Sequence, residues 1–151
     1  METRDVDKER SELRFAAMNL LARREHSRQE LERKLSARSS NNALLAQVLD
    51  QLAEQGLQSE QRFAEAFIRS RITRGQGLYR IQQELRQRGV ADSITGVALE
   101  EIEIDWFELA KETALRRFGE MPAKDPKERA KRMRFLQYRG FSSDQIQYAM
   151  S

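Results

Sequence analysis

Side chains that could carry acid–base, nucleophilic or metal chemistry are scarce in this sequence. It has one histidine, His26, and no cysteine, so it offers neither a set of imidazole ligands nor a thiolate. The Arg-Gly-Gln-Gly stretch (74–77) lacks the Lys-Ser/Thr pair of a phosphate-binding loop, and the acidic stretch 100–106 has no hydroxyl or histidine beside it. We therefore predict a protein that is not an enzyme and has no catalytic, cofactor-binding or metal-binding residues. We expect His26 to pack or form hydrogen bonds at a helix start.

The chemistry that the sequence does offer is that of arginine. The chain has 151 residues, with 27 lysines and arginines against 24 aspartates and glutamates, and a net charge of +3. Only six of those 27 basic residues are lysines, so 21 are arginines. The planar guanidinium group pairs with carboxylates and phosphates, either on a protein or on a nucleic acid. Arginine-mediated binding is therefore the function class that composition favours.

Positive charge gathers in two stretches of the chain. Residues 69–88 carry six arginines against Glu84 alone, and residues 127–139 carry six basic residues against Glu128 alone. Between them, residues 98–112 carry six acidic residues against one lysine. A surface polarised in this way steers binding to a charged partner. The candidate contact residues in the two basic stretches are Arg69, Arg71, Arg74, Arg80, Arg86, Arg88, Arg132, Arg134 and Arg139.

The elements that must position these arginines are helices. Apolar residues recur at three- and four-residue spacing, and no segment alternates like a strand. Ser27 followed by Glu30 is a capping box, and Ser142 followed by Gln145 is a second. Asp125 before a proline marks a further helix start. The pattern predicts an all-α protein of about nine helices.

The helices fall into an internal repeat. Residues 81–99 align with residues 132–150 at an offset of 51, and both segments carry an arginine-glycine pair followed by an apolar residue. Residues 28–35 match the same pattern less closely at an offset of 50, but the segment 36–42 replaces the tight turn. Each repeat reads as a long helix, a short basic helix, a turn and a third helix.

We therefore predict three tandem three-helix repeats that form helix-turn-helix-like units, with boundaries at 8–57, 58–104 and 105–151. A unit of about 50 residues buries little apolar surface alone, so we expect the units to stack on one another. Good caps, at about 1 kcal/mol each, supply part of the stability that a thin core lacks.

Three motifs in this order resemble the RecX family of regulators of the RecA recombinase. The stretch REHSRQELERKL (24–35) is similar to the first family signature. The second signature resembles LQSEQRFAEAFIRSRITRGQG (57–77) with RIQQELRQRGV (80–90), and the third resembles RFLQYRGFSSDQI (134–146). The resemblance spans residues 20–150, nearly the whole chain. One departure is Leu78, where the family usually has proline after the second glycine.

This resemblance implies a curved, elongated array of three three-helix repeats without enzymatic activity. It implies binding to the RecA filament on single-stranded DNA, along its helical groove. It also implies inhibition of the ATPase, strand exchange and filament growth, and so modulation of recombination, DNA repair and the SOS response. The arginines above would face acidic filament surface, DNA phosphates, or both, and Tyr79, Phe135 and Tyr138 are candidate anchors, with core packing favoured for Phe135.

A stand-alone helix-turn-helix-like DNA-binding protein is the alternative from another class, and a purely structural scaffold is a third. A dimeric operator reader needs a two-fold interface, and the sequence shows no long zipper-like seam. We therefore expect a monomer. No stretch is long and apolar enough to span a membrane, no secretion signal is evident, and the lack of cysteine fits the cytoplasm.

Overall fold

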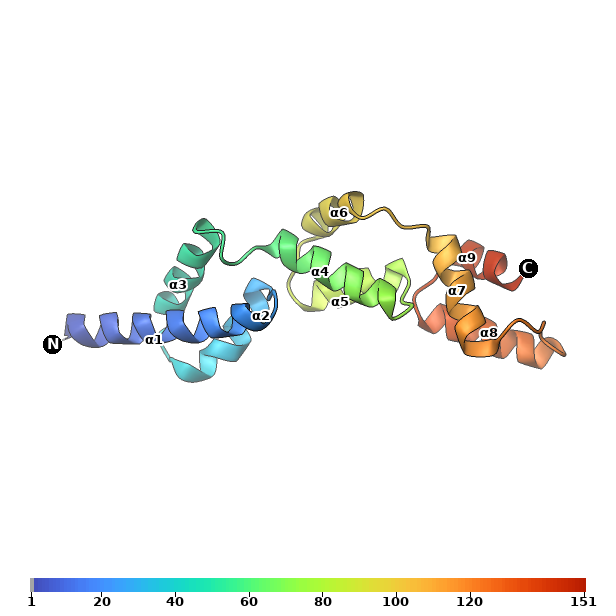
Figure 1. Ribbon diagram of the computed structural model, residues 1–151. Helices are drawn as coiled ribbons and strands as arrows, with labels where there is room; N and C mark the ends of the chain where they lie inside the picture. Colours follow the sequence, from blue (N-terminus) through green and yellow to red (C-terminus); the bar gives the residue numbers. More distant parts are fainter. Residues whose placement is uncertain (1) are drawn as a thin grey trace.

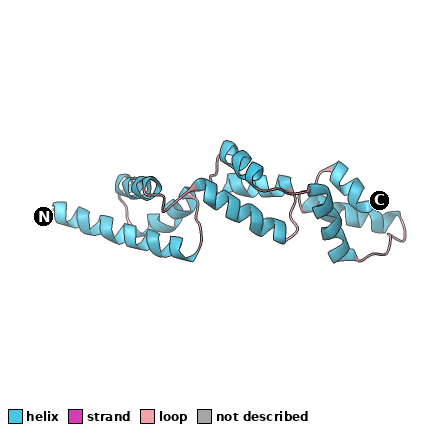
Figure 2. Ribbon diagram, turned by 45° about the horizontal axis from the view of Figure 1, so that its top comes forward, coloured by secondary structure: helices cyan, strands magenta, loops and turns pink. Residues whose placement is uncertain are grey.

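The structure, a computed structural model, describes residues 2–151, with side chains from Asp5 onward. The described chain contains nine α-helices and one short 3-10 helix, and it has no strand (Figure 2). The all-α prediction is therefore confirmed. The helices follow one another in an elongated array whose two ends lie far apart (Figure 1).

The helices group into three units, each with a buried apolar cluster of its own. The first unit comprises α1 (Glu2–Arg23), α2 (Arg28–Leu35), the 3-10 helix η1 (Ser36–Arg38) and α3 (Asn42–Glu54). The second comprises α4 (Glu60–Thr73), α5 (Leu78–Gln87) and α6 (Asp92–Glu101). The third comprises α7 (Trp106–Phe118), α8 (Pro126–Tyr138) and α9 (Ser143–Met150).

The second helix of each unit is held by buried apolar side chains, and α2 and α8 also have side-chain caps, whereas α5 starts at Gly77 without one. The predicted order of a long helix and then a short one is wrong for the third unit, where α7 and α8 both have 13 residues. The repeat-related leucines Leu35, Leu85 and Leu136 are fully buried, one in each cluster. The two predicted capping boxes are confirmed: each serine side chain accepts from the N3 amide, and the N3 side chain accepts from the serine amide. Asp125 caps α8 as predicted, with Pro126 at the first helical position.

The arginine-glycine turn of the repeat joins neighbouring units. Arg88 and Arg139 end α5 and α8, and the glycine after each has a positive φ, 81° for Gly89 and 99° for Gly140. The Arg88 carbonyl oxygen accepts from the Ser27 hydroxyl of the first unit at 2.8 Å. Both turns therefore end a short helix in the left-handed conformation that glycine adopts easily.

The turn of the third unit meets the second unit in the corresponding place. The Gly77 amide, at the start of α5, donates to the Arg139 carbonyl oxygen at 2.7 Å, and the Tyr79 amide donates to the Gly140 carbonyl oxygen at 3.2 Å. A Cβ atom on Gly77 would lie 2.5 Å from the Gly140 carbonyl carbon and oxygen. A Cβ atom on Gly140 would lie 2.5 Å from the Arg80 Cβ atom. Only glycine fits on both sides of this contact.

The first and third units depart from the second at this element. In the first unit, η1 and the Asn41-capped start of α3 replace the arginine-glycine turn. In the third unit, α8 begins at Pro126, which the 51-residue offset aligns with Gly75, three residues before α5 starts.

His26 lies at the first junction and is buried, with 1% of its surface exposed. Its Nδ1 atom is 3.1 Å from the Arg24 carbonyl oxygen, and its Nε2 atom is 3.0 Å from the Lys34 Nζ atom. A neutral imidazole satisfies both contacts, with Nδ1 donating and Nε2 accepting from the lysine. The backbone carbonyl oxygen of His26 accepts from the Gln58 side-chain amide at 3.3 Å, across the junction. The predicted role at a helix start is confirmed.

Replacing Ser27 should cost more than replacing Ser142, because Ser27 caps its helix and also bonds across the junction. Ser27→Ala should lower the free energy of unfolding by about 2 kcal/mol, half for the cap and half for the junction bond. Ser142→Ala removes only a matching capping box and should cost about 1 kcal/mol. Urea unfolding of both variants measures the difference, and equal losses would contradict the junction role.

The chain should lose stability as the pH falls below about 6.5. Burial, with the nearby charges of Arg24 and Lys34, lowers the pKa of His26 below its ordinary value, despite the Arg24 carbonyl and Glu30. Below the ordinary pKa, the unfolded chain binds a proton at His26 that the folded chain does not. The contribution of neutral His26 to the free energy of unfolding is therefore fully present above about pH 7 and decreases as the pH falls. Urea unfolding between pH 5 and pH 7.5 measures this slope, and His26→Gln should remove it.

Candidate functional site at the unit junctions

Three of the predicted contact arginines are exposed and free of internal pairing. Arg69 lies on α4, Arg74 lies at the C-terminal end of α4, and Arg134 lies on α8. None of the three forms an ion pair with any side chain that the structure describes, residues 5–151. Their guanidinium groups are therefore available to a partner without breaking an internal contact.

Five more predicted arginines are engaged within the protein. Arg71 and Arg80 both pair with Glu84, at 2.9 Å and 3.2 Å, and Arg86 pairs with Asp92 at 2.8 Å. Arg88 lies 3.8 Å from the Glu30 carboxylate, across the first junction. The Arg139 side chain donates to the Arg74 carbonyl oxygen at 2.8 Å, across the second junction. These arginines help to hold the units. The ion pairs of Arg80, Arg86 and Arg88 are exposed or half-exposed, the Arg71 pair is more buried, and Arg139 has only its hydrogen bond to the backbone.

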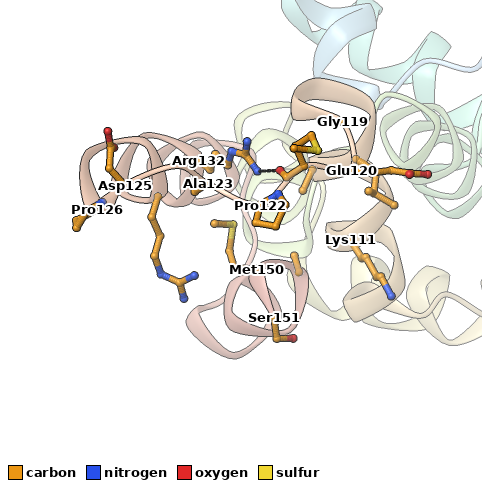
Figure 3. A pocket seen from close by; sticks show the side chains of 15 residues that line it. Lys111, Gly119, Glu120, Pro122, Ala123, Asp125, Pro126, Arg132, Met150 and Ser151 are labelled. Atoms are coloured by element: carbon orange, nitrogen blue, oxygen red, sulfur yellow. Dashed lines mark hydrogen bonds between the residues drawn. The ribbon is translucent and has the colours of Figure 1, made fainter.

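The structure gives Arg132 an internal role that the sequence did not reveal. Its side chain is buried at the far end of the third unit, beside the loop that follows α7 (Figure 3). It donates to the Met121 carbonyl oxygen at 2.8 Å and to the Glu128 carboxylate at 2.9 Å. Its guanidinium carbon also lies 5.1 Å from the centre of the Phe118 ring. Arg132 therefore anchors this loop instead of facing solvent.

The predicted aromatic anchors divide in the same way. Tyr79 and Tyr138 are 61% and 75% exposed, and both lie at the second junction. The Arg80 guanidinium carbon lies 4.9 Å from the Tyr138 ring centre, across that junction. Phe135 packs against the core of the third unit and meets Phe118 edge to face at 5.3 Å, so the core role favoured for it is confirmed.

A groove of about 430 Å³ lies at the first junction, between the first and second units. Two of its arginines stand opposite Glu30: Arg24 pairs with that carboxylate at 3.1 Å, and Arg88 lies 3.8 Å from it. Glu25, which also lines the groove, pairs at 3.1 Å with Arg62 outside it. Burial alone would raise the pKa of Glu30, but the Arg24 contact and the Ser27 amide outweigh it and lower that pKa. The arginines that line this first groove are Arg24, Arg71, Arg74 and Arg88.

A second groove, of about 240 Å³, lies at the junction of the second and third units. It is lined by two residues that directly follow α4, three from α7, and two from α8 and its turn. Its residues are Arg74, Gly75, Thr113, Arg116, Arg117, Phe135 and Arg139, with four arginines and no carboxylate. Arg74 lines both grooves. The arginines that line either groove are called the arginine track below.

Three arginines of this track were absent from the sequence-based candidates. Arg24 corresponds to Arg74 at the 50-residue offset that relates the first two short helices. Arg117 corresponds to Arg71 when the helix starts at Ser59 and Asp105 are aligned, and Arg116 lies beside it. The repeat could have found Arg24 and Arg117, but Arg116 aligns with Ser70. Arg116 and Arg117 also follow an acidic stretch, which hid them in a count of local charge.

No group of three or more His, Asp or Glu side chains among the described residues is placed to hold a metal ion. None of the helices in the described residues combines the length and the apolar character needed to cross a membrane. The grooves can bind anions through guanidinium groups, and this is the chemistry that their geometry supports.

Each of the three units matches a domain of one known protein family. Family models match the three units in order: "RecX, first three-helix domain" at residues 14–52, the second at residues 59–99 and the third at residues 103–150. "Regulatory protein RecX" from Halorhodospira halophila is 50% identical over 137 residues, which cover 91% of this chain and 85% of that protein. The protein of the same name from Chromohalobacter salexigens is 50% identical over 135 residues, covering 89% and 88%.

Solved structures share the fold at lower sequence identity. A crystal structure of RecX from Lactobacillus salivarius has a TM-score of 0.78 and 22% identity, and the match covers 95% of both chains. A second crystal structure, of a regulatory protein RecX, also has a TM-score of 0.78, with 24% identity over 92% of this chain and 71% of that one. With all three units matched in order and relatives at half identity over most of its length, this chain belongs to the RecX family of regulatory proteins.

Proposed function

We propose that this protein regulates the RecA recombinase by binding the filament that RecA forms on single-stranded DNA. In this proposal it acts without catalysis, in the cytoplasm, as a monomer. It inhibits ATP hydrolysis, strand exchange and filament growth, and so modulates recombination, DNA repair and the SOS response. Its membership of a family of regulatory proteins supports the regulatory role, and the observation that carries the binding mode is the arginine track across both junctions.

An elongated array suits a partner that is itself a polymer. Three stacked units present arginines at repeat-related places, because each junction gathers residues from two units. A filament repeats its subunits along its axis, so units in series can contact neighbouring subunits together. Several weak contacts made at once give far tighter binding than any one of them. The array would in this way bridge subunits whose relative movement accompanies hydrolysis and exchange.

The contact residues that we propose follow from the pairing described above. The exposed and unpaired Arg69, Arg74 and Arg134 would reach the filament directly. Arg80, Arg86 and Arg88 pair with carboxylates at or near the surface and would contribute to the same face, with Arg71 and Arg139 shaping the junctions. Because Arg132 is buried and bonded to its own loop, we assign it to stability instead of contact.

The proposal predicts that this protein slows ATP hydrolysis by RecA on single-stranded DNA when present at well below one copy per RecA monomer. Bridging several subunits, or blocking growth at a filament end, lets one copy act on many subunits. Steady-state hydrolysis with this protein titrated in, at excess single-stranded DNA, measures the effect. A DNA-coating protein that only sequesters DNA serves as the control.

Two results would contradict the proposal: no inhibition at any ratio, or inhibition that excess DNA abolishes, as competition for DNA requires. Arg74→Glu, at the residue that lines both grooves, with Arg134→Glu should raise the half-inhibitory concentration about tenfold, since two exposed ion pairs at up to about 1 kcal/mol each would be lost. The pair Arg33→Glu with Arg129→Glu makes the same change of charge at exposed positions outside the proposed contact set and should leave inhibition near its original level.

A further inference from the structure

A groove on the first unit shares no residue with the two junction grooves. It has a volume of about 540 Å³ and lies between α1 on one side and α2 with η1 on the other. We call it the outer groove, and its lining includes Phe15, Leu20, Arg23, Lys34 and Arg38. The Phe15 side chain is 69% exposed, so a large aromatic ring lies in water beside three cations.

The outer groove is the first unit's copy of a face that forms a junction elsewhere in the array. The first helices of the first two units align at an offset of 51, because buried Leu13 and Ala17 then match buried Ala64 and Ile68. At this offset, all six α1 residues of the outer groove fall on the six residues of α4 and its C-terminal end that line the first groove. The two grooves are therefore the same face of two repeats.

In the second and third units this face is covered by the unit before it. Arg24, Glu25 and Glu30 of the first unit close the first groove, and Arg74 and Gly75 of the second unit close the second. The outer groove is lined only by residues of α1, α2 and η1, so nothing from another unit covers it in the part of the chain that the structure describes. It is an open copy of a face that elsewhere binds protein.

The arginine of this face shows what an occupant must offer. Arg88 lies 3.8 Å from the Glu30 carboxylate of the preceding unit, and Arg139 donates to the Arg74 carbonyl oxygen of the unit before its own. Their counterpart in the first unit is Arg38, which aligns with Arg88 at the offset of 50. Arg38 is exposed and forms no ion pair with any side chain of residues 5–151. An occupant that replaces a preceding unit would give this arginine an acceptor oxygen.

The charge of the outer groove favours an acidic occupant. Three cations line it, Arg23, Lys34 and Arg38, against one carboxylate, Glu12. Glu9, which precedes the groove on α1, accepts from a serine hydroxyl of the same unit. Two positive charges therefore remain in the groove, and complementary charge steers and orients an acidic partner.

The apolar side chains of the groove favour a protein segment as this occupant. At the offset of 51, Phe15 and Leu20 stand where the second unit has Ala66 and Arg71, so the open copy of the face is the more apolar one. Phosphate groups would leave these two side chains uncovered. A protein segment can place a large apolar side chain on them, and such anchors supply much of the affinity of protein interfaces.

We infer that the outer groove is a docking site for an acidic segment of a partner protein, with a large apolar side chain against Phe15 and Leu20 and a carboxylate against Arg38. The segment takes the place that the preceding unit takes at the two junctions. This inference goes beyond the proposed function, because it adds a binding surface that is separate from the arginine track and needs no recombinase for its test.

The probe is a fluorescein-labelled helical peptide of glutamate and leucine that begins with a serine cap. The whole protein is titrated into it, and binding is followed by fluorescence anisotropy. Phe15→Ala with Arg38→Gln should weaken binding about tenfold, because the variant loses an apolar contact and an exposed ion pair. Both side chains are exposed, so the variant should fold normally.

The matched control is Met121→Ala with Arg129→Gln, in the loop between α7 and α8 and on α8, at the other end of the array (Figure 1). It removes the same charge and an apolar side chain that is 76% exposed. It should keep the affinity of the original protein to within about twofold, because neither residue lines the outer groove. A peptide of lysine and leucine of the same length should bind the original protein at least about tenfold more weakly than the acidic peptide.

The inference is overturned if the acidic peptide does not bind, if both variants lose the same affinity, or if the lysine peptide binds as tightly as the acidic one. A groove variant that keeps its peptide affinity but loses affinity for an oligothymidylate would make nucleic acid the occupant. A dimer of the original protein in sedimentation velocity that the groove variant abolishes would make a second copy the occupant. Either result would also overturn the inference. Both variants leave the arginine track intact, so none of these results contradicts the proposed function.

Discussion

Two backbone hydrogen bonds between the entrance of α5 and the turn after α8 carry the arrangement of the second and third units. The amide of Gly77 and the amide of Tyr79 donate to consecutive carbonyl oxygens of Arg139 and Gly140. Backbone groups can meet this closely only without side chains between them, so glycine is required in both segments, at Gly77 and at Gly140. The same turn one unit earlier accepts a serine hydroxyl in place of an amide. One local structure, repeated, thus sets the direction in which the units stack.

This contact also explains where the candidate contact arginines gather. At the first junction the turn carries Arg88 and the end of α1 is followed by Arg24; at the second junction the turn carries Arg139 and α4 is followed by Arg74. Each junction therefore brings guanidinium groups together from two units. At the first junction the protein uses carboxylates to hold this charge, and the ion pairs add to the interface. At the second junction two backbone hydrogen bonds make the contact, and none of the ion pairs among the described residues crosses it. The same turn therefore stacks the units and gathers the arginines to which the proposed function assigns binding.

Much of the fold follows from local sequence. The capping boxes at Ser27 and Ser142 act between residues three apart, and the buried leucines recur at helical spacing, so both could be predicted without knowledge of the third dimension. The internal repeat, the family resemblance and the all-α class rest on the same local signals. What a local pattern could not reveal is which arginines find an internal partner. Arg132 and Arg134 are two residues apart on one helix, yet one is buried against the loop after α7 and the other is exposed.

The candidate site was predicted only in part for the same reason. The basic stretches identified Arg74 and Arg139, but their neighbours Arg116 and Arg117 belong to α7, which is brought to the groove by tertiary packing. The role of the arginine-glycine pair was also hidden. The sequence indicates only that this pair ends a helix. The structure shows that the carbonyl oxygens of the turn accept hydrogen bonds from the preceding unit.

The most direct test of this account is the distance distribution across the second junction. The chain has no cysteine, so Gln83→Cys and Arg129→Cys introduce two exposed labelling sites, one in each unit, for spin labels and pulsed electron resonance. We predict one narrow distribution, which Gly140→Ala broadens because its Cβ atom would meet Arg80, and which Gly56→Ala preserves because nothing lies within 4 Å of that Cβ atom. A broad distribution in the parent protein, or a narrow one that survives Gly140→Ala unchanged, would contradict the claim that turn docking fixes the units.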